Sequence, residues 1–350
     1  MTVPRQATGP AAAPAADASV AAHSVARLTE MADYIVPFTL RAICDLGIAD
    51  LLAEGPRPVG ELAAATGTHA PALLKAMRAL AGRGVFTETA PEVFGLTPLG
   101  QPLRSDHPRS LRDAYPLIPA DVQAWALLDH SLRTGRAAFD LAHGQSYWEY
   151  MERHPEESAR FDASQRAVTR REIRALVPAY EWGAFGTVAD IGGGSGAFVA
   201  ALLAAHPGMR GVLFDQPHVV AGAGAVLAEQ GVADRCSVVG GSFYESVPSG
   251  ADAYVLKRVL YDVGDDGAAR VLRAVRAAMR PGSRLLIVEP LLEPGDEFSW
   301  GKLYDLLLLT MRGGGSRSLP RLEELMREAD LEPVRVVRTK GLPITEARPV

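Results

Sequence analysis

A glycine-rich segment followed by an acidic residue is the part of the chain best suited to binding a ligand. Residues 188–196 read VADIGGGSG, and the apolar start predicts a short buried strand that ends in a glycine-rich turn. Gly192 and Gly194 lack a Cβ, so a ligand can come close to the backbone. A second apolar strand ends in Asp215, where a carboxylate typically accepts hydrogen bonds from ribose hydroxyls. These residues predict a nucleoside-containing cofactor at the carboxyl end of a parallel sheet.

The turn by itself is compatible with two cofactors. It fits Gly-x-Gly-x-x-Ala through Gly192, Gly194 and Ala197, a pattern of dinucleotide binding, which leaves a nicotinamide-dependent oxidoreductase open. It also fits the Asp-x-Gly-x-Gly-x-Gly loop of S-adenosylmethionine-dependent methyltransferases. The choice therefore depends on residues further along the chain.

Strands and helices alternate from residue 186 onward. This alternation predicts an α/β fold with a doubly wound, mostly parallel sheet and helices on both faces. We expect a final strand at 331–337. The expected strands are 187–191, 211–215, 236–239, 252–257 and 284–289, and the expected helices are 197–205, 218–229, 267–280 and 319–329.

The N-terminal half predicts a mostly helical, winged-helix-like domain. A helical apolar pattern at 28–46 precedes two short helices, at 60–65 and 71–81, and a hairpin at 85–96. A ligand-sensing DNA-binding regulator is one interpretation, but helix 71–81 carries only Lys75 and Arg78 as cations, so we favour a packing or dimerisation module. The expected domains are a disordered lead-in at 1–22, the winged-helix domain at 23–110, a helical pocket region at 111–180 and a cofactor-binding domain at 181–350.

The composition is that of an ordinary globular protein. The 350 residues carry a net charge of −5, which disfavours a dedicated nucleic-acid partner. We expect no membrane partner, because no apolar run is long enough to span a bilayer. The two cysteines form no redox or metal spacing, so we expect a reducing cytoplasm and no bound metal.

The motifs that follow the glycine turn select between the two cofactors. They are DQPHVV at 215–220, GSFY at 241–244, LKRVLYD at 256–262, MRPGS at 279–283 and LLIVE at 285–289. Together they resemble the small-molecule O-methyltransferases of the class I fold, particularly the caffeate-type plant enzymes and their bacterial antibiotic-pathway relatives. The resemblance covers most of the chain. It implies S-adenosyl-L-methionine as cofactor, S-adenosyl-L-homocysteine as product and a homodimer.

The resemblance also assigns roles to individual residues. Gly192 and Gly194 would pass under the methionine portion of the cofactor, and Asp215 would hold the ribose. Ser242 and Phe243 would flank the adenine, although Ser242 stands where the family has an aspartate, so one adenine hydrogen bond is altered. The lysine that the family places near the cofactor is matched by Lys257, with Arg258 beside it.

The catalytic residues are where this chain departs from the family. Relatives carry a histidine base in Leu-His-Asp-Trp, steadied by two glutamates; here Tyr261 replaces the histidine and is followed by Asp262. Glu289 retains the first glutamate position, whereas Ser316 replaces the second. A tyrosine with its ordinary pKa of ~10 is protonated at neutral pH and donates rather than accepts.

Three hypotheses follow from the missing base. Methylation proceeds mostly by proximity, on an oxygen acidified by its own ring substituents; or His130 from the helical region acts as base; or the enzyme has another S-adenosylmethionine-dependent task, such as C-methylation or a non-methylating reaction. The expected acceptor is a phenolic natural-product intermediate such as a polyketide-derived hydroxybenzoate. Two forms of the acceptor stay open, a free molecule and one tethered to an acyl-carrier protein. The expected pocket residues are Trp125, Trp148, Tyr150 and Phe161 from the helical region, and Asp305 and Met311 from a helix at 303–311.

Overall fold

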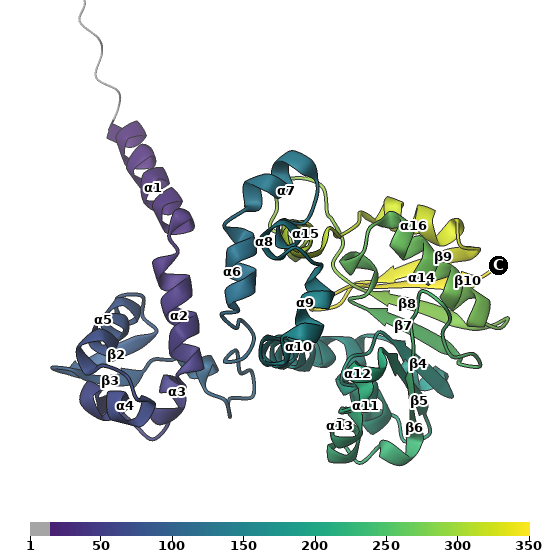
Figure 1. Ribbon diagram of the computed structural model, residues 1–350, viewed down its shortest axis with the longest axis horizontal. Coiled ribbons are helices and arrows are strands. Elements are labelled where there is room, and N and C mark those ends of the chain that lie inside the picture. Colours follow the sequence, from purple (N-terminus) through teal and green to yellow (C-terminus); the bar gives the residue numbers. More distant parts are fainter. Residues whose placement is uncertain (1–14) are drawn as a thin grey trace, which may run out of the picture. The chain divides into compact units, whose positions relative to one another are not determined.

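The computed structural model describes residues 15–350, with side chains from residue 23 onward (Figure 1). The chain divides into two compact units, one as far as Pro108 and the other from Arg109 to Val350. The division lies close to the domain boundary expected at residue 110. The helical region at residues 111–180 belongs to the same unit as the sheet that follows it.

The first unit combines helices with a small three-stranded sheet of order β1-β3-β2. Its core gathers Leu62, Met77, Leu80, Phe86 and Phe94, all fully buried. Helix α5 with the β2–β3 hairpin gives the predicted winged-helix arrangement. The elements are α1 (Ala15–Ala32), α2 (Ile35–Asp45), α3 (Ile48–Leu51), β1 (Arg57–Pro58), α4 (Val59–Thr66), α5 (Ala70–Ala81), β2 (Phe86–Ala90), β3 (Val93–Leu96) and the 3-10 turn η1 (Gln101–Leu103).

The start of this unit corrects two expectations. A disordered lead-in was expected over residues 1–22, and residues 1–14 of it lie outside the described residues. From Ala15 the chain is helical. This segment is rich in alanine, the residue with the highest helix propensity. The single helical pattern at 28–46 is two helices. Asp33 accepts hydrogen bonds from the backbone N–H groups of Ile35 and Val36, at 2.8 and 3.4 Å, and so begins a new helix at α2.

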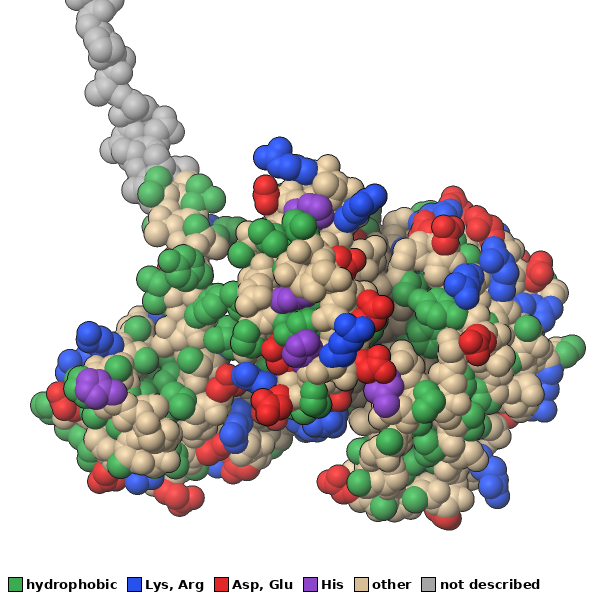
Figure 2. Space-filling model, in the orientation of Figure 1, with side chains coloured by type: hydrophobic (Ala, Val, Ile, Leu, Met, Phe, Trp, Pro, Cys, Tyr) green, Lys and Arg blue, Asp and Glu red, His purple; other side chains and the backbone are tan. Residues whose placement is uncertain are grey.

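The charges of this unit do not favour a DNA-reading helix. Arg78 on α5 pairs with Glu88 of strand β2 at 3.2 Å, so one of the helix's two cations already has a carboxylate partner. On the face of the molecule shown in Figure 2, basic and acidic side chains are interspersed rather than gathered into a basic patch. These charges favour the interpretation of the first unit as a packing or dimerisation module over that of a DNA-binding domain.

The second unit contains the predicted doubly wound sheet, with strand order β6-β5-β4-β7-β8-β10-β9. All neighbouring strands pair in parallel except at β10, which is antiparallel to both β8 and β9. The expectation that the chain's last strand is 331–337 was wrong, because β10 follows it. The strands are β4 (Thr187–Ile191), β5 (Arg210–Asp215), β6 (Cys236–Gly240), β7 (Ala253–Lys257), β8 (Arg284–Val288), β9 (Leu331–Val337) and β10 (Ile344–Pro349).

Helices cover both faces of this sheet (Figure 1). Helices α14 and α16 pack on one face around Leu272 and Leu322, while α11 and α13 pack on the other around Leu202 and Leu227. The helix expected at 218–229 is split into α12 and α13 near Gly222, a residue of low helix propensity. The helices are α11 (Ala197–Ala205), α12 (Pro217–Val220), α13 (Ala223–Glu229), α14 (Asp265–Ala278), α15 (Trp300–Arg312) and α16 (Leu319–Arg327), with 3-10 turns η4 (Ala233–Arg235) and η5 (Leu260–Asp262).

The helices before the sheet form a separate apolar cluster with α15. Met311 packs there with Ile118, Phe139, Tyr147 and Met151. Among the described residues, no helix is both long enough and apolar enough to cross a membrane. The helices are α6 (Pro119–Trp125), α7 (Leu128–Thr134), α8 (Ala138–His143), α9 (Tyr147–Arg153) and α10 (Pro155–Leu176), followed by the 3-10 turns η2 (Val177–Ala179) and η3 (Trp182–Ala184).

Candidate active site

The glycine turn after β4 lies against the end of β5. The backbone N–H of Gly192 donates to the Phe214 carbonyl at 2.7 Å, and the N–H of Gly194 donates to Asp215 Oδ2 at 2.8 Å. Gly192 has a φ of 69°, and a Cβ there would come within 2.7 Å of Val259 Cγ2. Glycine is therefore required by both conformation and space. Burial raises the pKa of Asp215, against the hydrogen bonds from Gln216 and Gly194.

A second carboxylate, Asp190 at the end of β4, lies beneath this turn. It is fully buried, and neither of its oxygens has a hydrogen-bonding partner among the described side chains and backbone. Burial raises its pKa to about 6, against the attraction of Lys257. A buried carboxylate without partners fits a ligand that brings positive charge or hydrogen-bond donors. S-adenosylmethionine, with its ammonium and sulfonium groups, is such a ligand.

Phe243 lies beside the glycine turn, as expected for a residue that flanks the cofactor. Its Cε1 is 3.7 Å from the position of a Cβ built on Gly192. The N–H of Gly241 donates to the Asp215 carbonyl at 2.9 Å, which brings the end of β6 to the end of β5. The Ser242 hydroxyl accepts from the backbone N–H of Tyr244 at 3.3 Å. The contact of Ser242 and Phe243 with adenine stays a prediction.

Lys257 and Arg258, at the end of β7, share one carboxylate from α10. Lys257 Nζ lies 3.5 Å from Glu172 Oε2 and donates to Thr169 Oγ1 at 3.2 Å. The Arg258 guanidinium lies 2.7 Å from Glu172 Oε1. The side chains of Lys257, Arg258 and Glu172 are 10%, 9% and 9% exposed, so one carboxylate compensates part of the charge of two cations away from water. Burial lowers the pKa of Lys257, against the attraction of Glu172.

Tyr261, in the position of the family's base, contacts Arg258. Arg258 Nη1 donates to the Tyr261 hydroxyl oxygen at 3.4 Å, and Nη2 donates to the Tyr304 hydroxyl oxygen at 3.2 Å. Tyr261 is buried, and burial raises its pKa above the ordinary value for tyrosine. The hydroxyl is therefore protonated at neutral pH and cannot take a proton from an acceptor.

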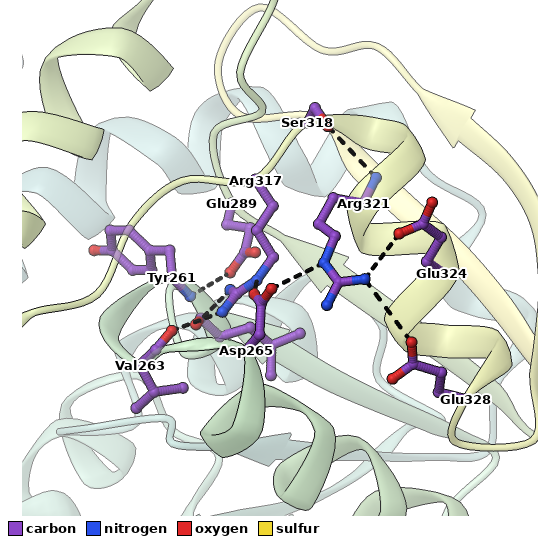
Figure 3. Close-up of polar contacts among 10 residues, drawn as sticks. Tyr261, Val263, Asp265, Glu289, Arg317, Ser318, Arg321, Glu324 and Glu328 are labelled. Carbon is purple, nitrogen blue, oxygen red and sulfur yellow. Dashed lines mark hydrogen bonds and ion pairs between the residues drawn. The ribbon is translucent and has the colours of Figure 1, made fainter. Parts of the chain in front are cut away.

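Glu289, at the end of β8, fixes the backbone of Tyr261 rather than its hydroxyl (Figure 3). Glu289 Oε2 accepts from the Tyr261 N–H at 3.1 Å, while Oε1 is buried without a partner among the described residues. Burial raises the pKa of Glu289 to about 7, against the attraction of Arg317. Ser316, which replaces the second glutamate of the family, is also buried, and its hydroxyl has no hydrogen-bonding partner among the described residues.

Arg317 holds the turn that carries Tyr261 (Figure 3). Its guanidinium donates to the carbonyls of Leu260 and Val263, both at 2.7 Å, and to Asp265 Oδ1 at 2.8 Å. Arg317 is buried, and these three bonds come from one planar side chain. The 3-10 turn η5 is thereby fixed from both sides, by Glu289 and by Arg317.

Asp262 pairs with Arg312, the last residue of α15. Burial raises the pKa of Asp262, against the attraction of Arg312. Three rings surround the Arg312 guanidinium, with Cζ 4.6 Å from the ring centres of Tyr147 and Trp148 and 5.3 Å from that of Phe161. Two of the expected pocket residues, Trp148 and Phe161, thus enclose a cation of the protein itself. Their contact with an acceptor stays a prediction.

The remaining predicted residues are spread over the helices of this unit. Trp125 ends α6 and is 38% exposed, and Met311 lies in the buried cluster described above. Tyr150 stacks on His154 at 3.7 Å and donates to Glu157 at 3.2 Å. His130 lies partly exposed on α7, which packs against α15. Asp305 on α15 faces the loop at 313–318, because a Cβ on Gly315 would come within 2.6 Å of its Oδ1.

The sequence pattern did not identify Glu172, Tyr304, Arg312 and Arg317 as site residues. Arg317 is adjacent to Ser316 in the loop that corresponds to the family's second glutamate, which is the only local signal for it. The other three lie in helical segments, where charged and aromatic residues are common. No group of three or more His, Cys, Asp or Glu side chains is arranged to hold a metal ion within the described part of the chain.

Comparison with protein-family models now identifies the class of protein. An O-methyltransferase domain matches residues 125–332, and an O-methyltransferase dimerisation domain matches residues 29–106. The chain belongs to the O-methyltransferase family, as the resemblance implied. The class I fold, with its helical N-terminal region, is confirmed by solved methyltransferases.

Individual relatives come from bacterial natural-product pathways. The chain is 43% identical to the phenazine O-methyltransferase PhzM of Lysobacter antibioticus over 319 residues, covering 91% of this chain and 94% of the relative. It is 37% identical to the mitomycin biosynthesis 6-O-methyltransferase of Streptomyces lavendulae, covering 85% and 88%. The crystal structure of LaPhzM superposes with a TM-score of 0.89 at 42% identity, covering 93% of this chain and 99% of that one.

Other relatives bear on the cofactor and on the reaction. One solved relative, NcsB1 from neocarzinostatin biosynthesis, holds S-adenosyl-L-homocysteine and 1,4-dihydroxy-2-naphthoic acid. The cofactor predicted from the resemblance, S-adenosylmethionine, is the one used by this family, and dinucleotide binding is not supported. The family is not uniform in reaction, however. A relative from Streptomyces purpurascens, 32% identical, is named aclacinomycin 10-hydroxylase RdmB.

Proposed function

We propose that this protein transfers a methyl group from S-adenosylmethionine to a phenolic hydroxyl of a small aromatic natural-product intermediate. The Asp190, Asp215 and glycine-turn geometry supports cofactor binding at the carboxyl end of the sheet. When bound there, the cofactor supplies an electrophilic methyl group on sulfur. The acceptor oxygen forms the new C–O bond, and the electron pair of the broken S–C bond stays on sulfur.

The observation that carries the mechanism is the buried Tyr261, which stands in the position of the usual base. Neither Tyr261 nor Ser316 can accept the phenolic proton at neutral pH. Glu289 uses Oε2 to accept a hydrogen bond from the Tyr261 backbone N–H. The protein's contribution is then to position the acceptor and exclude water, which brings large rate gains by itself. The acceptor oxygen has to lose its proton through its own acidity, which ring substituents supply.

The experiment uses the purified full-length protein with S-adenosylmethionine and phenols of graded acidity. Formation of S-adenosylhomocysteine and of a methyl ether, followed by mass spectrometry, should be fastest for the acidic phenols. The pH–rate profile should follow the ionisation of each acceptor. The absence of any methyl ether, with cofactor still bound, would contradict the proposed activity.

His130 provides the test of the alternative base. If His130 takes the proton, the profile has a limb that is independent of the acceptor and vanishes in His130→Ala. We expect the His130→Ala profile to match that of the wild type. His69→Ala, which changes an exposed histidine in the first unit, is the control.

C-methylation or a non-methylating reaction is the second candidate, and two observations favour it. The chain lacks two of the three catalytic groups of the family, and a relative that is 32% identical is named a hydroxylase. Mass spectrometry of the same incubations shows whether a methyl group is added at all, and NMR of the product separates a methyl ether from its C-methylated isomer, which has the same mass.

The partners of the enzyme are also part of this proposal. The dimerisation domain at 29–106 and the exposed apolar residues of α1, among them Leu28 and Met31 at 64% and 73% exposure, support a homodimer. Cys44 and Cys236 are not joined in a disulfide, which supports a reducing cytoplasm. The relatives named above carry no indication of an acyl-carrier protein, so the proposal takes the acceptor as a free molecule.

A further inference from the structure

Two tyrosine hydroxyls share one buried guanidinium in the candidate active site. Arg258 donates to the hydroxyl oxygens of Tyr261 and Tyr304, and the two rings lie 6.3 Å apart at 80°. Each hydroxyl oxygen accepts from Arg258, so each retains its own O–H to donate. Within the described part of the chain, neither O–H has an acceptor.

Contacts with the surrounding structure hold Arg258 in an unfavourable backbone conformation. The residue has a φ of 59°, a left-handed conformation that a side chain with a Cβ rarely adopts. Its backbone N–H still donates to the Val288 carbonyl at 3.0 Å, and Glu172 receives its guanidinium at 2.7 Å. Strain of this kind persists only where surrounding contacts fix it, and it is concentrated at functional sites.

We propose that Tyr261 and Tyr304, backed by Arg258, form an oxyanion-binding pair that receives an ionised phenolic oxygen of the acceptor. This inference rests on the proposed function and adds a substrate class, the aryl oxide. The two O–H groups donate to the oxygen, and a remaining lone pair is left for the methyl group. A hydroxyl that itself accepts from a guanidinium is a stronger donor, and preorganised donors of this kind stabilise negative charge without reorganisation.

The charges around the pair allow an anion to bind there. Among the described residues, Glu172 on α10 is the only carboxylate paired with Arg258, and it also faces Lys257, so two cations share one anion. Asp262 of η5 faces Arg312 of α15, which compensates it. Asp190, which lies beside Gly193 of the glycine turn, also attracts Lys257. Tyr304 is only partly buried, which leaves its hydroxyl within reach of a ligand.

The test measures the ionisation of a bound probe and does not require turnover. The probe is 4-nitro-1-naphthol, whose ionised form absorbs visible light, bound to the full-length protein with S-adenosylhomocysteine. Its apparent pKa is measured by titration, free and bound. 1-Naphthol, similar in shape but weakly acidic, is the comparison ligand. We expect the bound pKa to fall by about one unit, a tenfold preference for the ionised form.

Variants assign this preference to the pair. Tyr261→Phe and Tyr304→Phe each remove one hydroxyl without opening a cavity, and each should lose several-fold of the preference. The double variant should return the bound pKa to its value in solution. Arg258→Met should do the same, and Arg258→Lys should retain part of the effect. The matched control is Tyr180→Phe, because Tyr180 lies under Arg335, 5.4 Å from its Cζ, outside this site.

The outcomes separate the inference from the proposed function. An unchanged bound pKa in the double Tyr→Phe variant, or no binding of either naphthol, would overturn the oxyanion-binding pair even if phenols are methylated. A lowered bound pKa that the double variant abolishes would support the pair even if no methyl ether forms. Cofactor affinity, measured by calorimetry, should be the same in the wild type, the tyrosine variants and the control.

Discussion

The Arg258 guanidinium and the Glu172 carboxylate meet at 2.7 Å, although the residues lie 86 positions apart in the chain. Glu172 comes from α10, in the helical region that precedes the sheet, and Arg258 follows β7. The pair therefore joins the helical region to the carboxyl edge of the sheet, beside Tyr261. The arrangement of the candidate site depends on this long-range contact.

Glu172→Gln should destabilise the fold. It leaves Lys257 and Arg258 buried without their shared counter-charge, and breaking a buried ion pair in this way costs about 3 kcal/mol or more. Urea denaturation of the wild type and the variant measures the free energy of unfolding. The comparison is Glu323→Gln, whose partner Arg327 is half exposed and whose loss should cost less than about 1 kcal/mol. Equal losses in the two variants would show that the Glu172 pair is no more stabilising than a surface contact.

Asp215→Asn should weaken cofactor binding by about tenfold or more, because a charged acceptor at the turn is replaced by a neutral amide. Calorimetry with S-adenosylhomocysteine measures the affinity. Asp252→Asn is the matched control, since Asp252 accepts from the backbone N–H groups of Gly186 and Thr187 at 3.0 and 2.9 Å, at the opposite end of β4. Loss of affinity in the control but not in Asp215→Asn would place the ribose site elsewhere.

Glu289 should make stability fall as pH rises. Its pKa of about 7 in the folded protein lies above the ordinary value of 4.5, so the native state holds a proton that the unfolded chain releases. The stability cost is absent below about pH 4.5, grows between 4.5 and 7, and is complete above pH 7. Glu289→Gln removes this dependence and should gain stability relative to the wild type between pH 5 and pH 8. Melting temperatures across that range test this; a constant difference would contradict the raised pKa.

Gly193→Ala should disrupt the turn by crowding. A Cβ there would lie 2.5 Å from Leu213 Cδ1 and 2.7 Å from Asp190 Cγ, both buried, and overpacking of this kind costs about 1–3 kcal/mol. Gly194→Ala meets open space and incurs only the strain of a φ of 60°, about 1 kcal/mol. Chemical denaturation of the two variants should rank Gly193→Ala as the less stable. The reverse order would mean that backbone strain, not crowding, limits this turn.

The sequence by itself determined the parts of the fold that depend on local patterns. Mostly apolar runs mark β4, β5, β7 and β8, because strands buried on both faces carry few polar side chains. The glycine turn and Asp215 follow directly from such runs. Parallel strands end at one edge, so the sequence also indicated that the glycine turn and Asp215 lie at the carboxyl end of the sheet, whereas their hydrogen bond is seen only in the structure.

Only the tertiary structure decided where charged residues are buried in the interior. Strand β10 contains the buried Glu346, which looks like a surface residue in sequence. Arg284 from β8 and Arg335 from β9 reach it at 3.1 and 2.7 Å, so the position of β10 between β8 and β9 makes the burial of this charge possible. The same holds for Arg258 with Glu172 and for Arg312 with Asp262. A charge is stable in the interior only beside a partner, and no local pattern shows which distant residue the folded chain will bring to it.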